Sequence, residues 1–570
     1  MPTQKNETVA ERIAAALARH GVEYLFAQSL PSAVVLAAEA AGIRQIAYRQ
    51  ENMGGAMADG YARVSGKVAV VCAQNGPAAT LLVPPLSEAM KASIPVVAIV
   101  QDVERDQTDR NAFQDLDQIT LFSSCTKWVK RVQVESRIED YVDAAFTAAA
   151  SGRPGPVALL LPADLLRASM PETPVARKAS FGYWPLDRQR PSDAVIREAC
   201  RWISQATAPV VIAGGGVHSA GAHAALGRLQ DLACLPIGTT NMGKGAVDEH
   251  HPLSFGVLGS LTGPRSLGEH TQQLVAQSDV VILVGTRTNQ NGTDNWRQIP
   301  TSAKVVHIDI DPEEIGRNYE ALRLPGDARE TLTALCEGLE REDLGHRRSN
   351  RPALERMIAD YWRAFDTARR PVATSTSGPI RPERVMTELQ PFISRGATIV
   401  ADASYSSMWV VGQLRARKAG HRFITPRGLA GLGWGVPLAM GVALARDGEP
   451  VIALVGDGGF AHSWAELETM VRHQIPVTII VLNNGILGFQ KDAETVKFGQ
   501  YTSACHFSEV DHAAIARACG CQSVSVADPS LLAQMIGEAV NSRKPHLIEV
   551  QTDPDAHPPL SLFAAMDSAA

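Results

Sequence analysis

Features of several protein classes are absent from this sequence. No stretch approaches 18 uninterrupted apolar residues, which a membrane-spanning helix needs, so no membrane span is expected. The first residues, MPTQKNETVAERI, are polar and lack the apolar run of a secretory signal. The 54 basic residues are outnumbered by 60 acidic ones, and the formal charge of −6 argues against a nucleic-acid-binding protein, which needs a basic surface.

Cysteine is scarce and scattered. The eight cysteines mostly lie in apolar runs such as VAVVCAQ, which is typical of reduced thiols and predicts a cytoplasmic protein. Cys519 and Cys521 form a C-x-C pair, with Cys505 and His506 upstream. Because this spacing matches none of the common zinc patterns, we do not expect a zinc site there.

The sequence does have a regular alternation of short β-rich runs and amphipathic stretches. This pattern is typical of parallel sheets covered by helices, so the predicted fold class is α/β. Breaks in the pattern divide the chain into three predicted domains, 1–185, 190–345 and 370–570, each expected to be a doubly wound parallel sheet. The predicted strands cover 23–27, 43–48, 68–73, 95–100, 156–161, 209–214, 280–285, 304–310, 397–402, 451–456, 477–482 and 546–551.

Three segments between or after these domains have a different character. The polar, proline-containing stretch 170–192 is expected to be a linker. The charged stretch 337–356 is expected to be an exposed connection or a surface helix. The small, alanine-rich tail after Pro558 is expected to be loosely held.

The most informative segment lies in the third predicted domain and reads GDGGFAHSWAELETMVRHQIPVTIIVLNNGILGF. An apolar strand leads directly into Asp457, and a second apolar strand leads into Asn484. Between them lies a helix whose start has the capping-box spacing of Ser463 and Glu466, and Pro476 ends it. A right-handed βαβ unit of this kind makes the two strands parallel and neighbouring. Asp457 and Asn484 therefore converge at the carboxyl edge of the sheet, where open α/β sheets bind ligands.

The chemistry of these two side chains is that of a metal site. A carboxylate and an amide oxygen are hard ligands that suit Mg²⁺ or Ca²⁺. A single carboxylate neutralises only part of the charge of a divalent metal ion, so phosphate oxygens can neutralise the rest. Gly458 and Gly459 let the backbone approach those oxygens, and the following helix N-terminus adds N–H donors. The sequence therefore predicts a metal–diphosphate site, against the alternative that GDGG and NNG are merely tight turns.

GDGGF followed by NNG at this distance resembles the signature of thiamine diphosphate-binding proteins. The resemblance extends over nearly the whole chain, and the order of three α/β domains is similar to that of the acetolactate synthase and benzoylformate decarboxylase group. It implies a pyrimidine-binding N-terminal domain, a Rossmann-like middle domain and a diphosphate-binding C-terminal domain. It also implies that Asp457, Asn484 and the backbone carbonyl of Ile486 are the ligands of a Mg²⁺ ion.

The segment AYRQENMGGAMADGYAR, residues 47–63, resembles the family's helix that carries an activating glutamate, and Glu51 falls on that position. In the family this carboxyl bonds a ring nitrogen of the aminopyrimidine and favours its imino tautomer, whose nitrogen removes the proton from C2 of the thiazolium. A glutamate in a largely apolar cleft can have its pKa raised to suit proton sharing. From the residues alone, Glu51 also fits an ordinary first-turn acid stabilised by the helix dipole.

The same comparison implies further contacts with the cofactor. TPRGLAGLGWGVP looks like the segment whose bulky residue holds the cofactor in a bent V shape, and Leu432 has that position. Ala430 would offer its carbonyl to the exocyclic amine of the cofactor. Ser404 and Ser406 resemble diphosphate-contacting positions.

The region around the substrate departs most from the family. Relatives have Phe-Gly-x-Pro-Gly after the first strand, whereas this chain has Phe-Ala-Gln-Ser-Leu-Pro, and the tryptophan that acetolactate synthases place after NNG is missing. No adjacent His-His pair lies in the first domain, which speaks against a pyruvate decarboxylase of the yeast type. The residues expected to face the substrate are Gln28, Ser29, Gln74, Phe113, Gln114 and Phe489. The amides among them favour a substrate bulkier or more polar than pyruvate.

The middle domain is less informative. Glycine-rich turns follow the strands at 209–214 and 280–285, and either could bind a nucleotide. Several relatives bind FAD or ADP in this domain and others keep the fold with no ligand, so a bound FAD stays open.

Together, these features imply a thiamine diphosphate- and Mg²⁺-dependent carbon–carbon lyase or ligase acting on a 2-oxo acid, an acetolactate synthase-like carboligase of the transferase or lyase class. Simple 2-oxo acid decarboxylation of the benzoylformate type is the first alternative. A non-catalytic thiamine diphosphate-binding protein and a flavin-dependent oxidase are the others. Because Glu51 and the metal site lie on different domains, and relatives share the cofactor between subunits, a homodimer or homotetramer with active sites at the subunit interface is expected.

Overall fold

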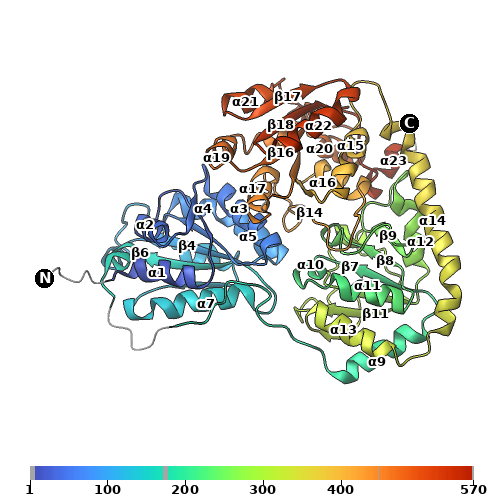
Figure 1. Ribbon diagram of the computed structural model, residues 1–570, viewed down its shortest axis with the longest axis horizontal. Coiled ribbons are helices and arrows are strands. Elements are labelled where there is room, and N and C mark those ends of the chain that lie inside the picture. The colour runs from blue at the N-terminus through green and yellow to red at the C-terminus, as the bar shows by residue number, and fades with distance from the viewer. Residues whose placement is uncertain (1–6, 171–176, 447, 568–570) are drawn as a thin grey trace.

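Three parallel sheets organise the chain. The computed structural model describes residues 7–170, 177–446 and 448–567, and within them each sheet has six strands. Figure 1 shows the three resulting units: the N unit in blue and cyan, the middle unit in green, and the C unit in orange and red. All pairings between the named strands are parallel, so the predicted α/β class with three parallel sheets is confirmed. The residue limits given above for the domains stay predictions.

In the N unit the strand order is β2-β1-β3-β4-β6-β5. Its strands are β1 (Tyr24–Phe26), β2 (Arg44–Ile46), β3 (Ala69–Ala73), β4 (Val96–Asp102), β5 (Trp128–Arg131) and β6 (Val157–Pro162). Its helices are α1 (Val9–Arg19), α2 (Ser32–Ala40), α3 (Glu51–Ser65), α4 (Pro77–Leu81), α5 (Val83–Ala92), α6 (Gln118–Ser123), α7 (Ile138–Ala150) and α8 (Ala163–Arg167). Strands β3 and β6 are buried along their whole length, because helices cover both faces of a parallel sheet.

The middle unit has the strand order β12-β11-β10-β7-β8-β9. Its strands are β7 (Pro209–Ala213), β8 (Ile237–Thr239), β9 (Ser254–Val257), β10 (Val280–Val284), β11 (Lys304–Asp309) and β12 (Leu322–Pro325). Its helices are α9 (Asp193–Gln205), α10 (Gly216–Ser219), α11 (His223–Leu232), α12 (Leu267–Ala276) and α13 (Ala328–Leu339). The order reverses between β10 and β7, which makes this the switch point where such sheets leave a crevice for a ligand.

The C unit has the strand order β14-β13-β15-β16-β18-β17. Its strands are β13 (Thr398–Ala401), β14 (Phe423–Ile424), β15 (Val451–Gly456), β16 (Val477–Asn483), β17 (Gln522–Val526) and β18 (His546–Gln551). Its helices are α15 (Pro382–Ser394), α16 (Tyr405–Gln413), α17 (Gly435–Ala445), α18 (Asp457–Phe460), α19 (Glu466–Arg472), α20 (Gly488–Phe498), α21 (His512–Ala518), α22 (Leu532–Ser542) and α23 (Ala564–Asp567).

The N and C units share a hydrophobic core. The buried apolar side chains of the N unit and of one face of the C-unit sheet form one continuous cluster, in which α3 and α17 pack directly on each other (Figure 1). Glycine makes this approach possible, because a Cβ on Gly60 would lie 2.2 Å from the carbonyl oxygen of Leu438 and one on Gly441 would lie 1.9 Å from that of Met57. The two helices therefore meet backbone to backbone at these points.

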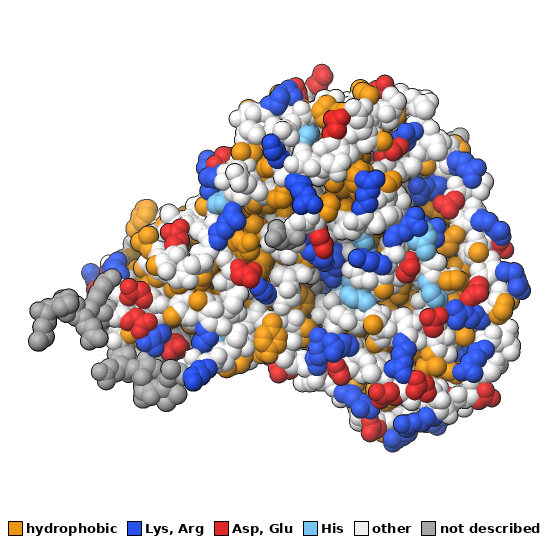
Figure 2. All heavy atoms as spheres, viewed as in Figure 1, with side chains coloured by type: hydrophobic (Ala, Val, Ile, Leu, Met, Phe, Trp, Pro, Cys, Tyr) orange, Lys and Arg blue, Asp and Glu red, His pale blue; other side chains and the backbone are white. Residues whose placement is uncertain are grey.

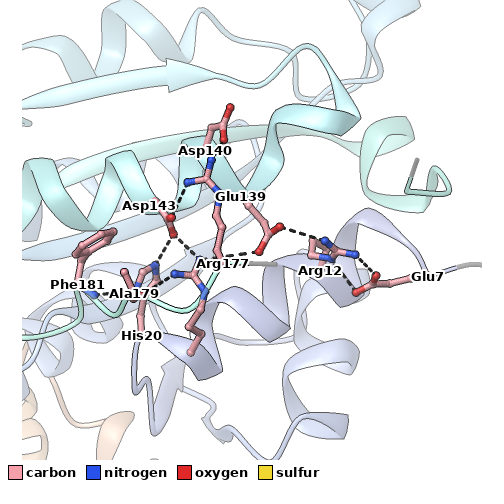
Figure 3. Close-up of polar contacts among 10 residues, drawn as sticks. Glu7, Arg12, His20, Glu139, Asp140, Asp143, Arg177, Ala179 and Phe181 are labelled. Atoms are coloured by element: carbon pink, nitrogen blue, oxygen red, sulfur yellow. Dashed lines mark hydrogen bonds and ion pairs between the residues drawn. The ribbon is translucent and has the colours of Figure 1, made fainter. Parts of the chain in front are cut away.

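An ion-pair network holds the segment between the N and middle units. Between residues 177 and 192 the chain has no helix or strand, as expected of a linker, while 171–176 lie outside the described residues. Figure 3 shows Arg177 reaching Asp140 and Asp143 on α7, with Nη1 donating to Asp143 Oδ2 at 2.8 Å. The buried His20 ring lies 2.9 Å from Asp143 through Nε2, and its Nδ1 accepts the backbone N–H of Phe181 at 3.0 Å. These contacts fasten the linker to α1 and α7.

A long surface helix and a packed tail complete the fold. Helix α14 (Gly345–Ala373) has 29 residues and runs along the edge of the middle and C units in Figure 1, so the expected surface helix is present. The expectation of a loosely held tail is wrong for residues 559–563, because Phe563 is 0% exposed and the Ser561 N–H donates to the Ser260 carbonyl at 2.8 Å.

Among the described residues no helix is both long and apolar enough to cross a membrane. Figure 2 shows acidic and basic side chains interspersed over one face of the molecule.

One local prediction in the C unit is wrong. The spacing of Ser463 and Glu466 predicts a capping box, but α19 begins at Glu466 and the Ser463 hydroxyl donates to the Phe460 carbonyl at 3.3 Å. The Glu466 carboxylate instead accepts backbone N–H groups of Arg49 and Gln50 in the N unit, at 3.0 and 3.1 Å. A contact across the molecule thus replaces the local cap.

Candidate active site

The ends of two neighbouring strands bring Asp457 and Asn484 together. Strands β15 and β16 are parallel and adjacent, with Gly456 opposite Leu482, as the sequence predicts. Asp457 begins α18, is 6% exposed, and accepts the backbone N–H of Gly485 through Oδ2 at 2.9 Å. This bond ties the first strand's end to the Asn-Asn-Gly turn that follows the second.

The oxygens at this edge have the character of metal ligands. Burial raises the pKa of Asp457 to about 6, and the N–H groups of Gly458 and Gly485 only partly oppose that rise. A cation beside the carboxylate would favour its ionised form. Asn484 Oδ1 accepts the N–H of Ile486 at 3.2 Å and the Ile486 carbonyl accepts one backbone N–H at 2.9 Å, so each oxygen keeps a further lone pair.

This donor set fits a Mg²⁺ ion that is completed by phosphate. One carboxylate, one amide and one carbonyl oxygen are hard donors of the kind that Mg²⁺ prefers. No group of three His, Cys, Asp or Glu side chains that could hold a metal by itself occurs in the described parts of the chain. The residues present therefore suit a metal that shares its coordination with a bound diphosphate.

The two glycines after Asp457 lie in closely packed surroundings. A Cβ on Gly459 would lie 2.1 Å from Asp402 Oδ2, and one on Gly458 would lie 2.9 Å from the Phe507 ring. The Asp402 carboxylate accepts the N–H groups of the three residues leading into α17, at 2.9 to 3.2 Å. Asp402 thus fixes the start of α17 beside the Asp457 turn, a role that the sequence analysis did not find.

The other predicted cofactor contacts lie on loops around this turn. Ser404 precedes α16 with a φ of 64°, and Ala430 has a φ of 61°; both angles are uncommon outside glycine and cluster at ligand sites. Ser406 is 5% exposed, and its Oγ lies 3.6 Å from where a Cβ on Gly456 would be. Leu432 is 38% exposed on the loop that leads into α17.

Glu51 lies in the N unit, at the first residue of α3. Its half-buried carboxylate has no hydrogen bond within the described part of the chain. The nearby Tyr48 hydroxyl donates to the Cys72 carbonyl at 2.6 Å, and burial and then the charge of Glu51 raise the Tyr48 pKa. The Glu51 carboxylate is therefore available to a ligand at the carboxyl edge of the N-unit sheet.

Three of the predicted substrate residues share that edge. Gln28 and Ser29 follow β1, and Gln74 follows β3, the next strand in the sheet. Gln28 Nε2 donates to the Arg49 carbonyl at 2.9 Å, which places it beside the segment that leads into Glu51. Ser29 is exposed and Gln74 is half-buried.

Phe113 and Gln114 are brought to the same edge by a loop after β4. Asn75 Nδ2 donates to the Gln114 carbonyl at 2.9 Å, and a Cβ on Gly76 would lie 2.7 Å from Gln114 Cβ. Gln114 has a φ of 61°, and its Oε1 is buried with no hydrogen bond. The Phe113 ring is 84% exposed.

Phe489 is separated from this group. Its ring packs edge-on against Tyr405 and Phe563 of the C unit, with centroids 5.9 and 6.0 Å away, and it is 38% exposed. The candidate residues therefore form two sets, one at the carboxyl edge of each terminal sheet.

Comparison with known proteins identifies the chain at this point. Residues 7–121 match the family described as "Thiamine pyrophosphate enzyme, N-terminal TPP binding domain", 196–335 match its central domain, and 402–550 match its C-terminal TPP binding domain. The chain belongs to the thiamine pyrophosphate enzyme family. Since two of the matched domains are TPP-binding, thiamine diphosphate as the predicted cofactor is confirmed.

Several relatives of this thiamine pyrophosphate enzyme carry acetolactate synthase names. The "Acetolactate synthase" of Arthrospira platensis is 32% identical over 570 residues, covering 97% of this chain and 96% of the relative. The "Probable acetolactate synthase large subunit" of Methanocaldococcus jannaschii is 31% identical over 564 residues, covering 96% and 92%. The "Acetolactate synthase isozyme 3 large subunit" of Escherichia coli is 30% identical over 564 residues, covering 96% and 95%. The resemblance to an acetolactate synthase-like enzyme is thus confirmed.

In the middle unit of this enzyme the two glycine-rich turns meet at the switch point. A Cβ on Gly214, after β7, would lie 2.3 Å from the carbonyl oxygen of Gly285, after β10. One on Gly216 would lie 2.6 Å from Gly285 Cα. Close backbone packing between neighbouring strands accounts for glycine at these positions.

A cavity rich in arginine opens beside these turns, where the three units meet. Its lining includes Arg63, Arg153, Arg287, Asp309, Arg422 and Arg427. Burial lowers the pKa of Arg422 to about 9 and that of Arg427 to about 10. Arg287, whose pKa burial also lowers, has neither a hydrogen bond nor an ion pair among the described residues. Arg63 and Arg153 have carboxylate partners, whereas Arg287, Arg422 and Arg427 have no ion pair among the described residues, and their charge suits an anionic ligand.

Proposed function

We propose that this thiamine pyrophosphate enzyme is a Mg²⁺-dependent, acetolactate synthase-like carboligase acting on a 2-oxo acid. The observation that carries the proposal is the buried Asp457 carboxylate bonded to the Asn-Asn-Gly turn at the carboxyl edge of two adjacent parallel strands. Homologues named acetolactate synthase support the reaction class.

The chain's own residues would divide the work of holding the cofactor. Asp457, Asn484 and the Ile486 carbonyl would hold Mg²⁺ against the diphosphate, with its charge offsetting the cost of ionising the buried carboxylate. The further diphosphate contacts in this proposal are Ser404, Ser406, Gly458 and Gly459. Leu432 would support the bent cofactor, and the Ala430 carbonyl would accept from its exocyclic amine.

Proton transfer is assigned to Glu51. When bound, thiamine diphosphate supplies the nucleophilic carbon and the electron sink for decarboxylation of a 2-oxo acid. Glu51 would share a proton between its carboxyl and the ring nitrogen of the aminopyrimidine. Its open carboxylate at the start of α3 supports this role. The substrate side would be lined by Gln28, Ser29, Gln74, Phe113 and Gln114 from the N unit and by Phe489 from the C unit.

A second copy of the chain is expected to complete the site. Phe113, Leu429, Leu432 and Phe489 are 84, 53, 38 and 38% exposed, and they lie around the carboxyl edges of the two terminal sheets. Exposed large apolar side chains near one site support an interface there. We therefore propose a homodimer or homotetramer whose active sites lie between subunits, which light scattering of the holoenzyme would measure.

We also propose that the arginine-lined cavity takes a nucleotide diphosphate, with FAD as the first candidate and ADP as the second. The position at the switch point and the unpaired Arg287 support it. Purified protein with a flavin absorbance spectrum would support FAD, and adenine released without flavin would support ADP.

We also propose a cytoplasmic location, because all eight cysteines are free thiols.

Product analysis separates the carboligase from its alternatives. The enzyme is loaded with thiamine diphosphate and Mg²⁺ and given a panel of 2-oxo acids that includes pyruvate. Acetolactate-type products or acetoin support a carboligase, whereas an aldehyde alone makes the chain a benzoylformate-type decarboxylase. Absence of carbon dioxide release from every substrate would leave a non-catalytic binding protein. We expect pyruvate to be used less well than a bulkier or more polar 2-oxo acid.

A further inference from the structure

Two buried glutamates form matching contacts between the terminal units. Glu88 on α5 and Glu466 on α19 are both 0% exposed. Glu88 accepts the backbone N–H groups of Gly428 and Leu429 in the C unit, at 2.7 and 2.5 Å. Glu466 accepts those of Arg49 and Gln50 in the N unit, at 3.0 and 3.1 Å. Each carboxylate therefore holds two consecutive backbone groups of the opposite unit.

The segments that these carboxylates hold are equivalent in the two units. Arg49 and Gln50 lead into α3, whose first residue is Glu51. Gly428 and Leu429 belong to the loop that leads into α17 and that also carries Ala430 and Leu432. In the proposed function, both segments would touch thiamine diphosphate, the first through its proton-sharing acid and the second through the support of its bent shape.

The electrostatic surroundings of the two carboxylates differ. Arg63 Nη2 lies 3.3 Å from Glu88, Asp59 pairs with the same guanidinium, and Arg63 Nη1 donates to the Thr425 carbonyl at 2.9 Å. Glu88 thus shares with Asp59 a buried cation that also holds the same loop.

Glu466 has no such cation. It accepts the Thr469 hydroxyl at 2.8 Å, and no lysine or arginine lies within ion-pair distance among the described residues. Burial raises the pKa of Glu466, while the Thr469 hydroxyl, the backbone N–H groups of Arg49 and Gln50 and, beyond ion-pair distance, the charge of Arg49 oppose the rise. N–H groups at a helix N-terminus favour a negative charge.

Burying a carboxylate costs more free energy than burying an apolar side chain of similar size. A buried carboxylate instead fixes the orientation of the backbone, because its two charge-assisted hydrogen bonds hold two consecutive peptide groups. Glu88 and Glu466 each apply that constraint one or two residues before a group that the proposed chemistry needs.

We propose that Glu88 and Glu466 are reciprocal positioning residues: Glu466 orients Glu51 for proton transfer, and Glu88 orients the loop of Ala430 and Leu432 for cofactor binding. This inference rests on the proposed function. It predicts that loss of the two carboxylates impairs different steps, because the segments they hold serve different steps.

The test compares Glu88→Gln and Glu466→Gln with the matched control Glu249→Gln. Glu249 is another buried glutamate that accepts a backbone N–H, that of Ala416 at 2.6 Å, but its carboxylate pairs with Lys244 and has no hydrogen bond to either loop among the described residues. For each full-length variant, calorimetry measures the thiamine diphosphate Kd with Mg²⁺, proton exchange at the cofactor C2 is timed at saturating cofactor, and thermal unfolding is recorded.

A split between the readouts is the expected result. Glu88→Gln should raise the Kd about tenfold and leave C2 exchange within about twofold, whereas Glu466→Gln should slow exchange about tenfold and change the Kd less than about threefold. Glu249→Gln should lower the Tm and leave both readouts unchanged. Where a glutamine variant does not fold, Glu88→Asp or Glu466→Asp, which keeps the charge but shortens the reach, should show the same split.

Losses that are equal in both readouts, or that follow the Tm in all three variants, would overturn the positioning roles. Wild-type protein that binds no thiamine diphosphate would overturn the proposed function and this inference with it. Bound cofactor without a split between Glu88 and Glu466 would overturn this inference alone.

Discussion

The N and C units have the same strand order but different carboxyl edges. Reading each sheet from its own first strand, both orders are 2-1-3-4-6-5, whereas the middle sheet reads 6-5-4-1-2-3. At the C-unit edge lie a buried carboxylate, an amide and two serines, which suit a metal and a charged diphosphate. At the N-unit edge lie Glu51 and several neutral amides. The same strand order therefore carries two different halves of the proposed site, and the residues at the strand ends distinguish them.

Removing the carboxylate of the C-unit edge should have the largest effect. Asp457→Ala should weaken thiamine diphosphate and Mg²⁺ binding by about a hundredfold or more, since it loses the charged ligand, and Asn484→Ala should weaken it by about tenfold. Asp309→Asn is the control, because burial raises the pKa of this middle-unit carboxyl to about 6 as well, yet it lies outside this edge. If calorimetry shows unchanged cofactor binding by Asp457→Ala, the C-unit edge does not hold the metal and the diphosphate as proposed.

Removing the acid of the N-unit edge should impair turnover rather than binding. Glu51→Gln keeps the shape of the side chain but loses the carboxyl proton, so kcat should fall by about 10² to 10⁴. The cofactor Kd should change much less, and hydrogen exchange at C2 should slow in proportion to kcat. Exchange at the wild-type rate in this variant would remove Glu51 from proton transfer.

A methyl group added to either α3 or α17 should disturb the packing between the N and C units. Gly60→Ala on α3 and Gly441→Ala on α17 each place a methyl group about 2 Å from a carbonyl oxygen, and each should destabilise the protein by about 1–3 kcal/mol. Gly537→Ala on α22 has no neighbour within 4 Å and should stabilise it by about 0.5–1 kcal/mol. Thermal unfolding should lower the Tm in the first two variants and raise it in the third; similar Tm values in all three would deny the backbone contact of α3 with α17.

The last predicted effect concerns the pH dependence of stability and of Mg²⁺ binding. Because burial raises the pKa of Asp457 to about 6, its contribution to folding of the cofactor-free protein is present below pH of about 4 and is lost as the pH rises through about 6. Metal binding needs the ionised form, so Mg²⁺ affinity should fall by about tenfold for each pH unit below about 6.

Calorimetry between about pH 5 and 8 measures that slope, after subtraction of the slope that free thiamine diphosphate itself shows with Mg²⁺. Asp309→Asn should leave the slope unchanged. An affinity that does not depend on pH in this range would show that the Asp457 carboxylate is not the group that binds the metal.

The sequence predicts most inner strands and few edge strands: the edge strand β2 is predicted, and the inner strand β8 is not. Strands such as β3, β10 and β15 are covered on both faces, so their apolar runs stand out. The strands without a prediction include β5, β9, β12, β14 and β17, each of which lies at the edge of its sheet. The strands β5, β12 and β17 are partly exposed and their sequences are partly polar, such as WVKR and QSVSV, whereas β9 and β14 are buried but have only four and two residues.

Some residues of the candidate site can be predicted from the sequence and others cannot. Asp457 and Asn484 are predictable because one local βαβ unit brings them together. Asp402, Glu88 and the partners of Glu466 are not, because their hydrogen bonds join segments that lie far apart in the sequence. The local spacing of Ser463 and Glu466 even predicts the wrong partner, since the capping box competes with a contact to the N unit that no spacing rule describes.

The reciprocal glutamates also bear on how the nascent chain acquires its structure on the ribosome. Arg49 and its partner Glu466 are 417 residues apart, so at about 5–20 residues per second the ribosome needs roughly 20 to 80 seconds to synthesise the chain between them. During that time the segment before Glu51 lacks its carboxylate partner, and α3 lacks α17. The start of α3 is therefore not fixed until the last third of the protein has been synthesised. Until then the face of α3 that packs on α17 is uncovered, which makes α3 a candidate client of chaperones during translation.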